Sequence, residues 1–190
     1  MLSSIHPLGE RARSNSWGVT VAAFAVGATG AGAALGVLAA TVGTATGLSA
    51  TPVLLPAMAL SIAAVFELTR LPVPTPHRQV NERWIGTYRG FVYGLGFGAQ
   101  LGAGFATYVV TWAVPALVLT IAWLGDPALG AVIGAVFGFG RSVPVLAAGW
   151  IDRPARLSQF NRRLTGAARA AHVTSVIVLT ALAVTAGIVA

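Results

Sequence analysis

Long apolar stretches alternate with short polar ones along the whole chain. The apolar stretches cover residues 17–43, 52–70, 90–124, 127–150 and 171–189. They are almost free of charge, and a helix needs about 20 apolar residues to cross the hydrocarbon of a bilayer. The pattern therefore predicts an all-α fold, a polytopic integral membrane helix bundle with about five crossings. We expect residues 1–190 to form a single membrane domain.

The third apolar stretch, residues 90–124, is too long for one straight crossing. As a continuous helix it would extend for about 52 Å, whereas the hydrocarbon is about 30 Å thick. Glycines loosen its first half, and Pro115 cannot donate the helical hydrogen bond to the carbonyl group of Thr111. We therefore expect one long interrupted segment. Transporters build binding sites from interrupted helices of this kind.

The arginines predict how the chain is oriented. They gather in residues 1–16, 70–89 and 151–169, whereas the connections 44–51 and 124–127 carry no positive charge. The positive-inside rule then puts the N-terminus in the cytoplasm and the C-terminus outside the cell (plasma) membrane. Both long basic stretches also carry apolar residues at helical spacing, which is typical of amphipathic cytoplasmic loops. These loops either only fix the orientation or also bind anionic lipid headgroups or a cytoplasmic protein partner.

The composition narrows the function classes. Apolar residues make up 56% of the chain and charged residues 9%, against about 25% charged in a typical soluble domain. The net charge of +7 comes from arginines between apolar stretches, which favours anionic headgroups over nucleic acid. Cysteine is absent, and the histidines have no metal-like spacing. We expect no enzyme activity, no metal and no cofactor.

Arg141 is the candidate that needs most explanation. It lies nine positions before Trp150, which is about 13 Å deeper along a helix. An arginine at such depth costs about 2.5–3.5 kcal/mol unless it is paired or hydrated. Glu67 is the carboxylate best placed to form a structural ion pair with it. Alternatively, Arg141 faces a cavity and binds an anionic group of a substrate, with Pro144 bending the helix nearby.

A polar and aromatic cluster lies in the middle of the interrupted stretch. Thr107 and Thr111 share one helix face, and Tyr108 and Trp112 share another. Their hydroxyl groups either make hydrogen bonds between helices or contact a substrate. Thr107, Tyr108, Thr111 and Arg141 are therefore the predicted substrate-binding residues.

Glycines repeat every four residues in the third and fourth apolar stretches. The two sets are Gly94, Gly98 and Gly102, and Gly130, Gly134 and Gly138. Small residues at this spacing let helix backbones approach closely in lipid. We expect the two stretches to pack against each other through these faces. A sliding surface in a moving transporter would use the same spacing.

One region carries a family resemblance. A glycine-rich stretch leads into a proline-containing break, and a second glycine-rich helix ends in a Gly140-x-x-x-Pro144 motif. In these features residues 90–150 resemble the second half of the cytochrome c biogenesis and thiol:disulfide interchange transmembrane family. The resemblance implies broken helices around a midplane site. The family's redox cysteine would fall at about Thr107 or Tyr108, so the resemblance implies that scaffold without its electron transfer.

Two function classes remain open. The first is a small solute transporter or exporter, or a subunit of one, with a midplane site at the broken helix. Because so short a chain encloses little by itself, we expect a homo-oligomer or a membrane partner. The alternative is a non-transporting membrane scaffold or accessory subunit that anchors a redox or catalytic partner.

Overall fold

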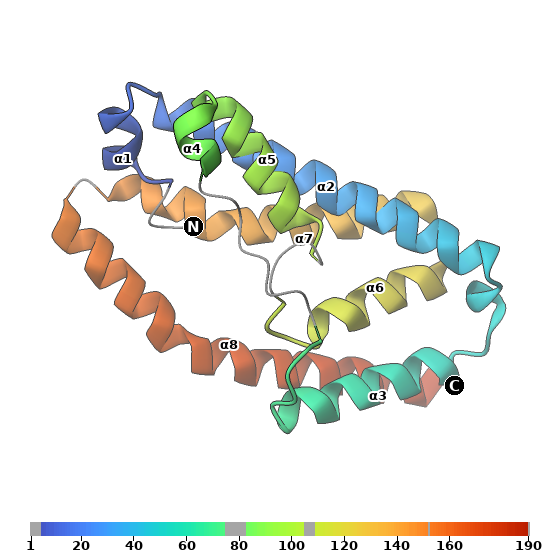
Figure 1. The fold of residues 1–190 in the computed structure, drawn as a ribbon. Coiled ribbons are helices and arrows are strands. Elements are labelled where there is room, and N and C mark those ends of the chain that lie inside the picture. The colour runs from blue at the N-terminus through green and yellow to red at the C-terminus, as the bar shows by residue number, and fades with distance from the viewer. Residues whose placement is uncertain (1–4, 75–82, 105–108, 152, 190) are drawn as a thin grey trace. The chain divides into compact units, whose positions relative to one another are not determined.

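The long helices of the chain are the apolar ones. The computed structural model describes residues 5–74, 83–104, 109–151 and 153–189, and throughout these ranges the only regular elements are helices (Figure 1). Three of them are long and apolar enough to cross a membrane: α2 (Trp17–Ala45), α7 (Pro127–Ala147) and α8 (Pro154–Val189). The predicted all-α fold is confirmed at this level.

Three shorter helices also come from apolar stretches: α3 (Leu54–Leu68), α5 (Gly90–Gly102) and α6 (Ala113–Leu124). Each extends for only about 18–23 Å, which is less than the thickness of the hydrocarbon. α5 and α6 divide the stretch expected to be interrupted, and Gly104 between them has a φ of 69°. The remaining short elements are α1 (Pro7–Ala12), η1 (Leu48–Ala50), α4 (Arg83–Thr87) and η2 (Ala148–Trp150).

The turn from α6 to α7 follows directly from its sequence. Gly125 has a φ of 65°, a left-handed conformation that glycine adopts without strain. Asp126 then caps α7, because its carboxylate accepts hydrogen bonds from the N–H groups of Ala128 (2.8 Å) and Leu129 (3.1 Å). Pro127 occupies the first helical position, where no N–H is needed.

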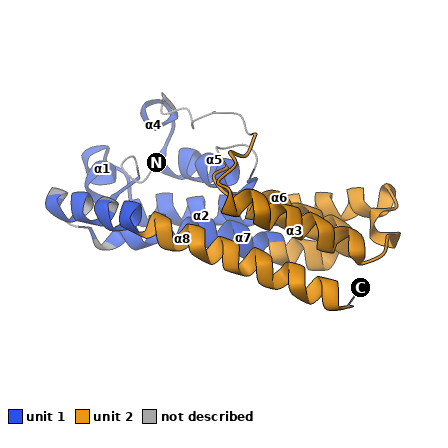
Figure 2. Cartoon of the chain, turned by 90° about the horizontal axis from the view of Figure 1, so that it is seen from below, with its two compact units in different colours: residues 1–34, 76–108, 134–166 blue, residues 35–75, 109–133, 167–190 orange. Residues whose placement is uncertain are grey.

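The helices group into two compact units (Figure 2). Unit 1 consists of residues 1–34, 76–108 and 134–166, and unit 2 of residues 35–75, 109–133 and 167–190. Each unit has its own apolar core. That of unit 1 contains Ile5, Val21, Phe24, Tyr93, Phe97 and Val145. Unit 2 buries Leu60, Ala63, Ala116, Leu179 and Ala183 in one cluster and Ala39, Ala40, Ile121 and Ala122 in another.

The glycine faces lie against α2. In unit 1, a Cβ atom on Gly94, Gly98 or Gly102 of α5 would overlap backbone oxygens of Thr20, Phe24 and Ala28, respectively. A Cβ on Gly138 of α7 would overlap the carbonyl oxygen of Ala28, and one on Gly32 that of Gly134. In unit 2, Gly36 and Gly130 approach each other in the same way. We expected the two glycine-rich stretches to pack on each other, whereas the nearest atoms to both belong to α2.

Two further expectations concern Pro144 and the second basic stretch. α7 continues through Pro144 without interruption, and the bend expected there stays a prediction. The second basic stretch is not a separate loop, because residues 154–169 form the first part of α8. Of the first basic stretch, residues 75–82 lie outside the described part, and α4 follows them.

Much of the apolar surface is exposed. In the apolar part of α8 only 6% of the residues are buried, and α2 exposes Val19, Val26, Leu38 and Val42 by half or more. Soluble monomers rarely expose apolar patches larger than a few hundred Å². Surfaces of this composition are compatible with helices that face lipid.

Candidate functional site

In unit 2, the helix that follows the interruption, α6, begins beside a buried carboxylate. Glu67, near the end of α3, is only 4% exposed. Its Oε2 accepts a hydrogen bond of 2.7 Å from the backbone N–H of Trp112, the residue before α6. Its backbone carbonyl oxygen lies 2.9 Å from Nε2 of His172 in α8. Since a carbonyl oxygen can only accept, this bond requires the ring proton on Nε2.

The side chain of Trp112 makes two further contacts with the end of α3 and the residues after it. Its indole N–H donates to the carbonyl oxygen of Leu71 at 2.8 Å, and its ring packs on Phe66 with 4.8 Å between centroids. We call Phe66, Glu67, Leu71, Trp112 and His172 the Glu67 junction. It joins the end of α3, the start of α6 and α8. Negative charge at the N-terminus of α6 is also favoured by the helix dipole.

Thr111 belongs to the same helix start. Its hydroxyl oxygen accepts a hydrogen bond of 3.1 Å from the N–H of Ala113, the first residue of α6. An α-helix leaves its first four N–H groups without intrahelical partners. Protein groups therefore satisfy the N–H groups of Trp112 and Ala113. Of the other predicted substrate-binding residues in this region, Thr107 and Tyr108 lie outside the described residues.

α3 ends in a tight left-handed turn beside the junction. Arg70 has a φ of 56°, a conformation that is usually reserved for glycine. The N–H of Leu71 donates to the carbonyl oxygen of Phe66 at 3.0 Å, and that of Arg70 to Glu67 at 3.1 Å. This pair of bonds is a Schellman motif. An arginine in this conformation costs roughly 1–2 kcal/mol relative to glycine, and backbone strain of this kind is often found at functional sites.

Arg141 lies on α7 within unit 1. Its Nη1 atom is buried and has no hydrogen-bond partner among the residues that the structure describes. The guanidinium carbon lies 5.5 Å from the ring centroid of Phe137, a cation–π contact beside the unpartnered Nη1 atom. Glu67 belongs to unit 2, so the proposed Glu67–Arg141 ion pair stays a prediction.

A second buried carboxylate was not predicted from the sequence. Glu10 of α1 is fully buried and accepts hydrogen bonds from Arg13 (2.6 Å), Thr20 of α2 (3.0 Å) and Tyr93 of α5 (2.5 Å). Asn15 donates to the Tyr93 hydroxyl oxygen at 3.3 Å. We call these five residues the Glu10 cluster. It fastens α1 to two apolar helices of unit 1.

Charge and close packing both support this cluster. Burial by itself lowers the pKa of Arg13, but the hydrogen bond and the negative charge of Glu10 outweigh it, so the pKa of Arg13 is raised. Gly90 and Gly94 allow α5 to reach Thr20, since a Cβ on either would overlap that residue. The buried carboxylate of Glu10 is therefore paired with the positive charge of Arg13.

The hydrogen-bond partners of these two glutamates could not be predicted from sequence patterns. Pro7 is a helix-start signal close to Glu10, but Tyr93 is 83 residues away along the chain. His172 likewise meets Glu67 across 105 residues. Both meetings are products of tertiary packing.

Comparison with known proteins gives no relative for this chain: no family model, characterised protein or solved structure matches it. The cytochrome c biogenesis resemblance therefore stays an expectation.

Proposed function

We propose that this chain is a small transporter or exporter for an anionic solute, or a subunit of one, in which Arg141 binds the solute. α5 and α6 together count as one interrupted crossing, which with α2, α3, α7 and α8 makes five. The positive-inside rule then favours a cytoplasmic N-terminus and an external C-terminus in the cell membrane. A homo-oligomer or a membrane partner would complete the solute path.

The buried Nη1 atom of Arg141 is the observation that carries the proposal. An unsatisfied buried donor costs roughly 1–3 kcal/mol, and more when it is charged. An oxyanion would accept from two N–H groups of the planar guanidinium at once. The solute would thus satisfy a group that the described residues leave without a hydrogen bond. Thr107, Tyr108 and Thr111 stay predicted substrate-binding residues.

Proteoliposomes test the proposal directly. Purified protein is reconstituted, and uptake of radiolabelled sulfate, phosphate and acetate is measured separately. We expect uptake of at least one anion. It should be abolished by Arg141→Gln and largely lost in Arg141→Lys, because an ammonium group cannot make two parallel hydrogen bonds. The control Arg153→Gln changes an exposed arginine of the same unit and should transport normally.

Each variant must elute from size exclusion like the wild-type protein before uptake is compared. Unchanged uptake in Arg141→Gln would refute a binding role for Arg141. Failure of the wild-type protein to move any of these anions would refute anion transport.

The Glu67 junction favours a second candidate function, a non-transporting scaffold or accessory subunit for a redox or catalytic partner. Protein groups already satisfy the N–H groups of Trp112 and Ala113, so no solute is needed there. A scaffold would leave every anion outside the vesicles. Its Arg141→Gln variant would change stability only.

A further inference from the structure

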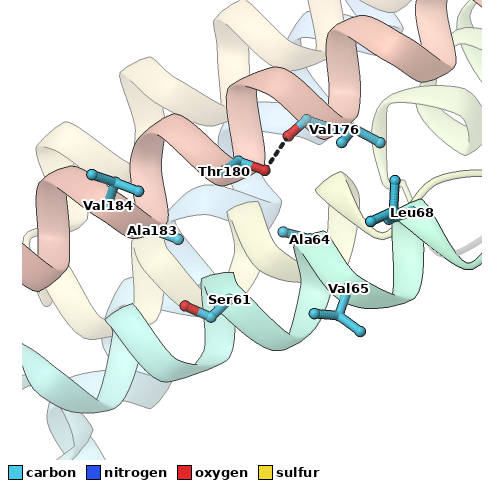
Figure 3. A pocket seen from close by; sticks show the side chains of 8 residues that line it. All are labelled: Ser61, Ala64, Val65, Leu68, Val176, Thr180, Ala183 and Val184. Atoms are coloured by element: carbon cyan, nitrogen blue, oxygen red, sulfur yellow. Dashed lines mark hydrogen bonds between the residues drawn. The ribbon is translucent and has the colours of Figure 1, made fainter.

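An apolar groove runs between α3 and α8 within unit 2 (Figure 3). Its volume is about 380 Å³. One wall comes from α3 and the other from α8, and α8 packs on α3 through Leu179 and Ala183. The lining residues are Ser61, Ala64, Val65 and Leu68 of α3 and Val176, Thr180, Ala183 and Val184 of α8.

The two hydroxyl groups in the lining are already used. Ser61 donates to the carbonyl oxygen of Ala57, and Thr180 to that of Val176, both at 2.8 Å within their own helices. Val65 and Val184 are more than half exposed, so the groove presents mainly methyl groups to its surroundings. An apolar chain fits this lining, whereas a polar solute would find few hydrogen-bonding groups.

The length of the groove matches one half of a bilayer. From Val176 to Val184 α8 rises by about 12 Å, and one leaflet contributes about 15 Å of hydrocarbon. The end of the groove at Leu68 and Val176 lies on the side of the Glu67 junction, since His172 meets Glu67 there. The groove therefore runs from this junction toward the middle of an apolar layer.

Two arginines lie near the same end of the groove. Arg70 follows Glu67 by three residues, in the turn that ends α3, and Arg169 precedes His172 by three, about one helical turn along α8. Both side chains are exposed. The nearby carboxylate of Glu67 is buried and bound to the N–H of Trp112. An anionic group would thus meet two arginines at the mouth of an apolar groove.

We propose that this groove binds one anionic phospholipid, with an acyl chain between α3 and α8 and its phosphate at Arg70 and Arg169. The left-handed conformation of Arg70 supports this occupant. A glycine there would relieve the strain but would offer no charge to the headgroup, whereas the arginine does. Such a lipid requires the helices to lie in a bilayer, but it requires no solute transport.

Native mass spectrometry in a mild detergent tests the proposal. The full chain is titrated with phosphatidylglycerol and with phosphatidylcholine of the same acyl chains. We expect one phosphatidylglycerol per chain to bind with clear preference. Each arginine should contribute about fivefold to this preference, so Arg70→Gly with Arg169→Gln should lower it by about 25-fold. Arg70→Gly retains the left-handed turn while it removes the charge.

Two further variants test the apolar part. Val65 lines this groove, whereas Ile62 lines the adjoining groove of α3, and both are exposed. Val65→Trp should weaken both lipids, and the matched control Ile62→Trp should weaken neither. Arg162→Gln, another exposed arginine of α8, should keep the preference.

Three results would overturn the proposal. One is a preference for phosphatidylglycerol that survives the double arginine replacement. Another is equal binding of both lipids to the wild-type protein. The third is a dimer that Val65→Trp converts to monomer, which would show that a second copy of the chain covers the groove. None of these results depends on whether the protein transports an anion.

Discussion

Glu10 and Glu67 are both buried carboxylates, but they are held in different ways. Side chains from three segments surround Glu10, and one of them, Arg13, is a cation. Glu67 has a backbone N–H as the partner of its carboxylate, at the start of the helix that follows the interruption. Glycines press α5 against α2 beside Glu10. Beside Glu67, α3 contains no glycine, and aromatic rings make the contact.

The difference separates a fixed site from an adjustable one. Backbones that touch through glycine have a single position, because any shift creates an overlap or a gap. Ring contacts and a single carboxylate can follow a helix that tilts slightly. We therefore expect motion at the Glu67 junction and rigidity at the Glu10 cluster. Three measurements sharpen this comparison.

The largest effect should follow loss of the Glu10 carboxylate. Glu10→Ala leaves Arg13, Thr20 and Tyr93 without their shared acceptor, which should reduce the free energy of unfolding by roughly 2–4 kcal/mol. Unfolding in mixed detergent micelles measures this loss. Arg11→Gln changes an exposed residue of the same helix and should cost almost nothing. A variant as stable as the wild-type protein would show that α1 is not fastened by Glu10.

An intermediate effect is expected where α5 meets α2. Gly94→Ala places a methyl group against the backbone of Thr20, and such overpacking costs typically 1–3 kcal/mol. The control is Gly140→Ala, because a Cβ there would have nothing within 4 Å. That variant should be neutral or slightly stabilising, since alanine favours helix over glycine. Equal stabilities for the two variants would show that the contact between α5 and α2 is not rigid.

The smallest effect should come from Glu67→Gln. The amide oxygen of glutamine still accepts from the N–H of Trp112, so the loss should stay below about 1 kcal/mol. Glu10→Gln should cost more, because one oxygen that accepts hydrogen bonds becomes an NH₂ donor facing other donors. The same micelle assay compares the two variants. If Glu67→Gln destabilises as strongly as Glu10→Gln, the charge of Glu67 matters and its partner is a cation.

The sequence predicted those parts of the fold that depend on local composition. The apolar stretches became helices at nearly the expected residues, and the stretch with Pro115 and clustered glycines was divided into α5 and α6. Whether an apolar run is long enough to cross a bilayer of fixed thickness can be judged from that run alone. α8 was predicted only in its apolar half, because arginines at helical spacing fit either a surface helix or the first turns of a longer one.

The site could be predicted only in outline. Arg141 was singled out because a charge in an apolar helix is costly wherever it lies. The Phe137 ring lies four residues before it on the same helix, a neighbour that helical spacing does predict, but the burial of its Nη1 atom depends on tertiary packing. The same holds for Glu10, whose partner Tyr93 has an apolar neighbourhood and no pattern of its own. Glycine spacing identified faces that pack closely but could not name α2 as the helix they meet.

The glycines of α2 also have a consequence for how the chain is made. Gly27, Gly32, Gly36 and Gly43 would each overlap backbone of a later helix if they carried a Cβ, and their partners are Leu95, Gly134, Gly130 and Ala122. During synthesis these glycines emerge 68 to 102 residues before their partners. These faces of α2 therefore stay uncovered until the later helices have been made. A chain stalled between residues 122 and 130 would still leave Gly32 and Gly36 without the helix that covers them.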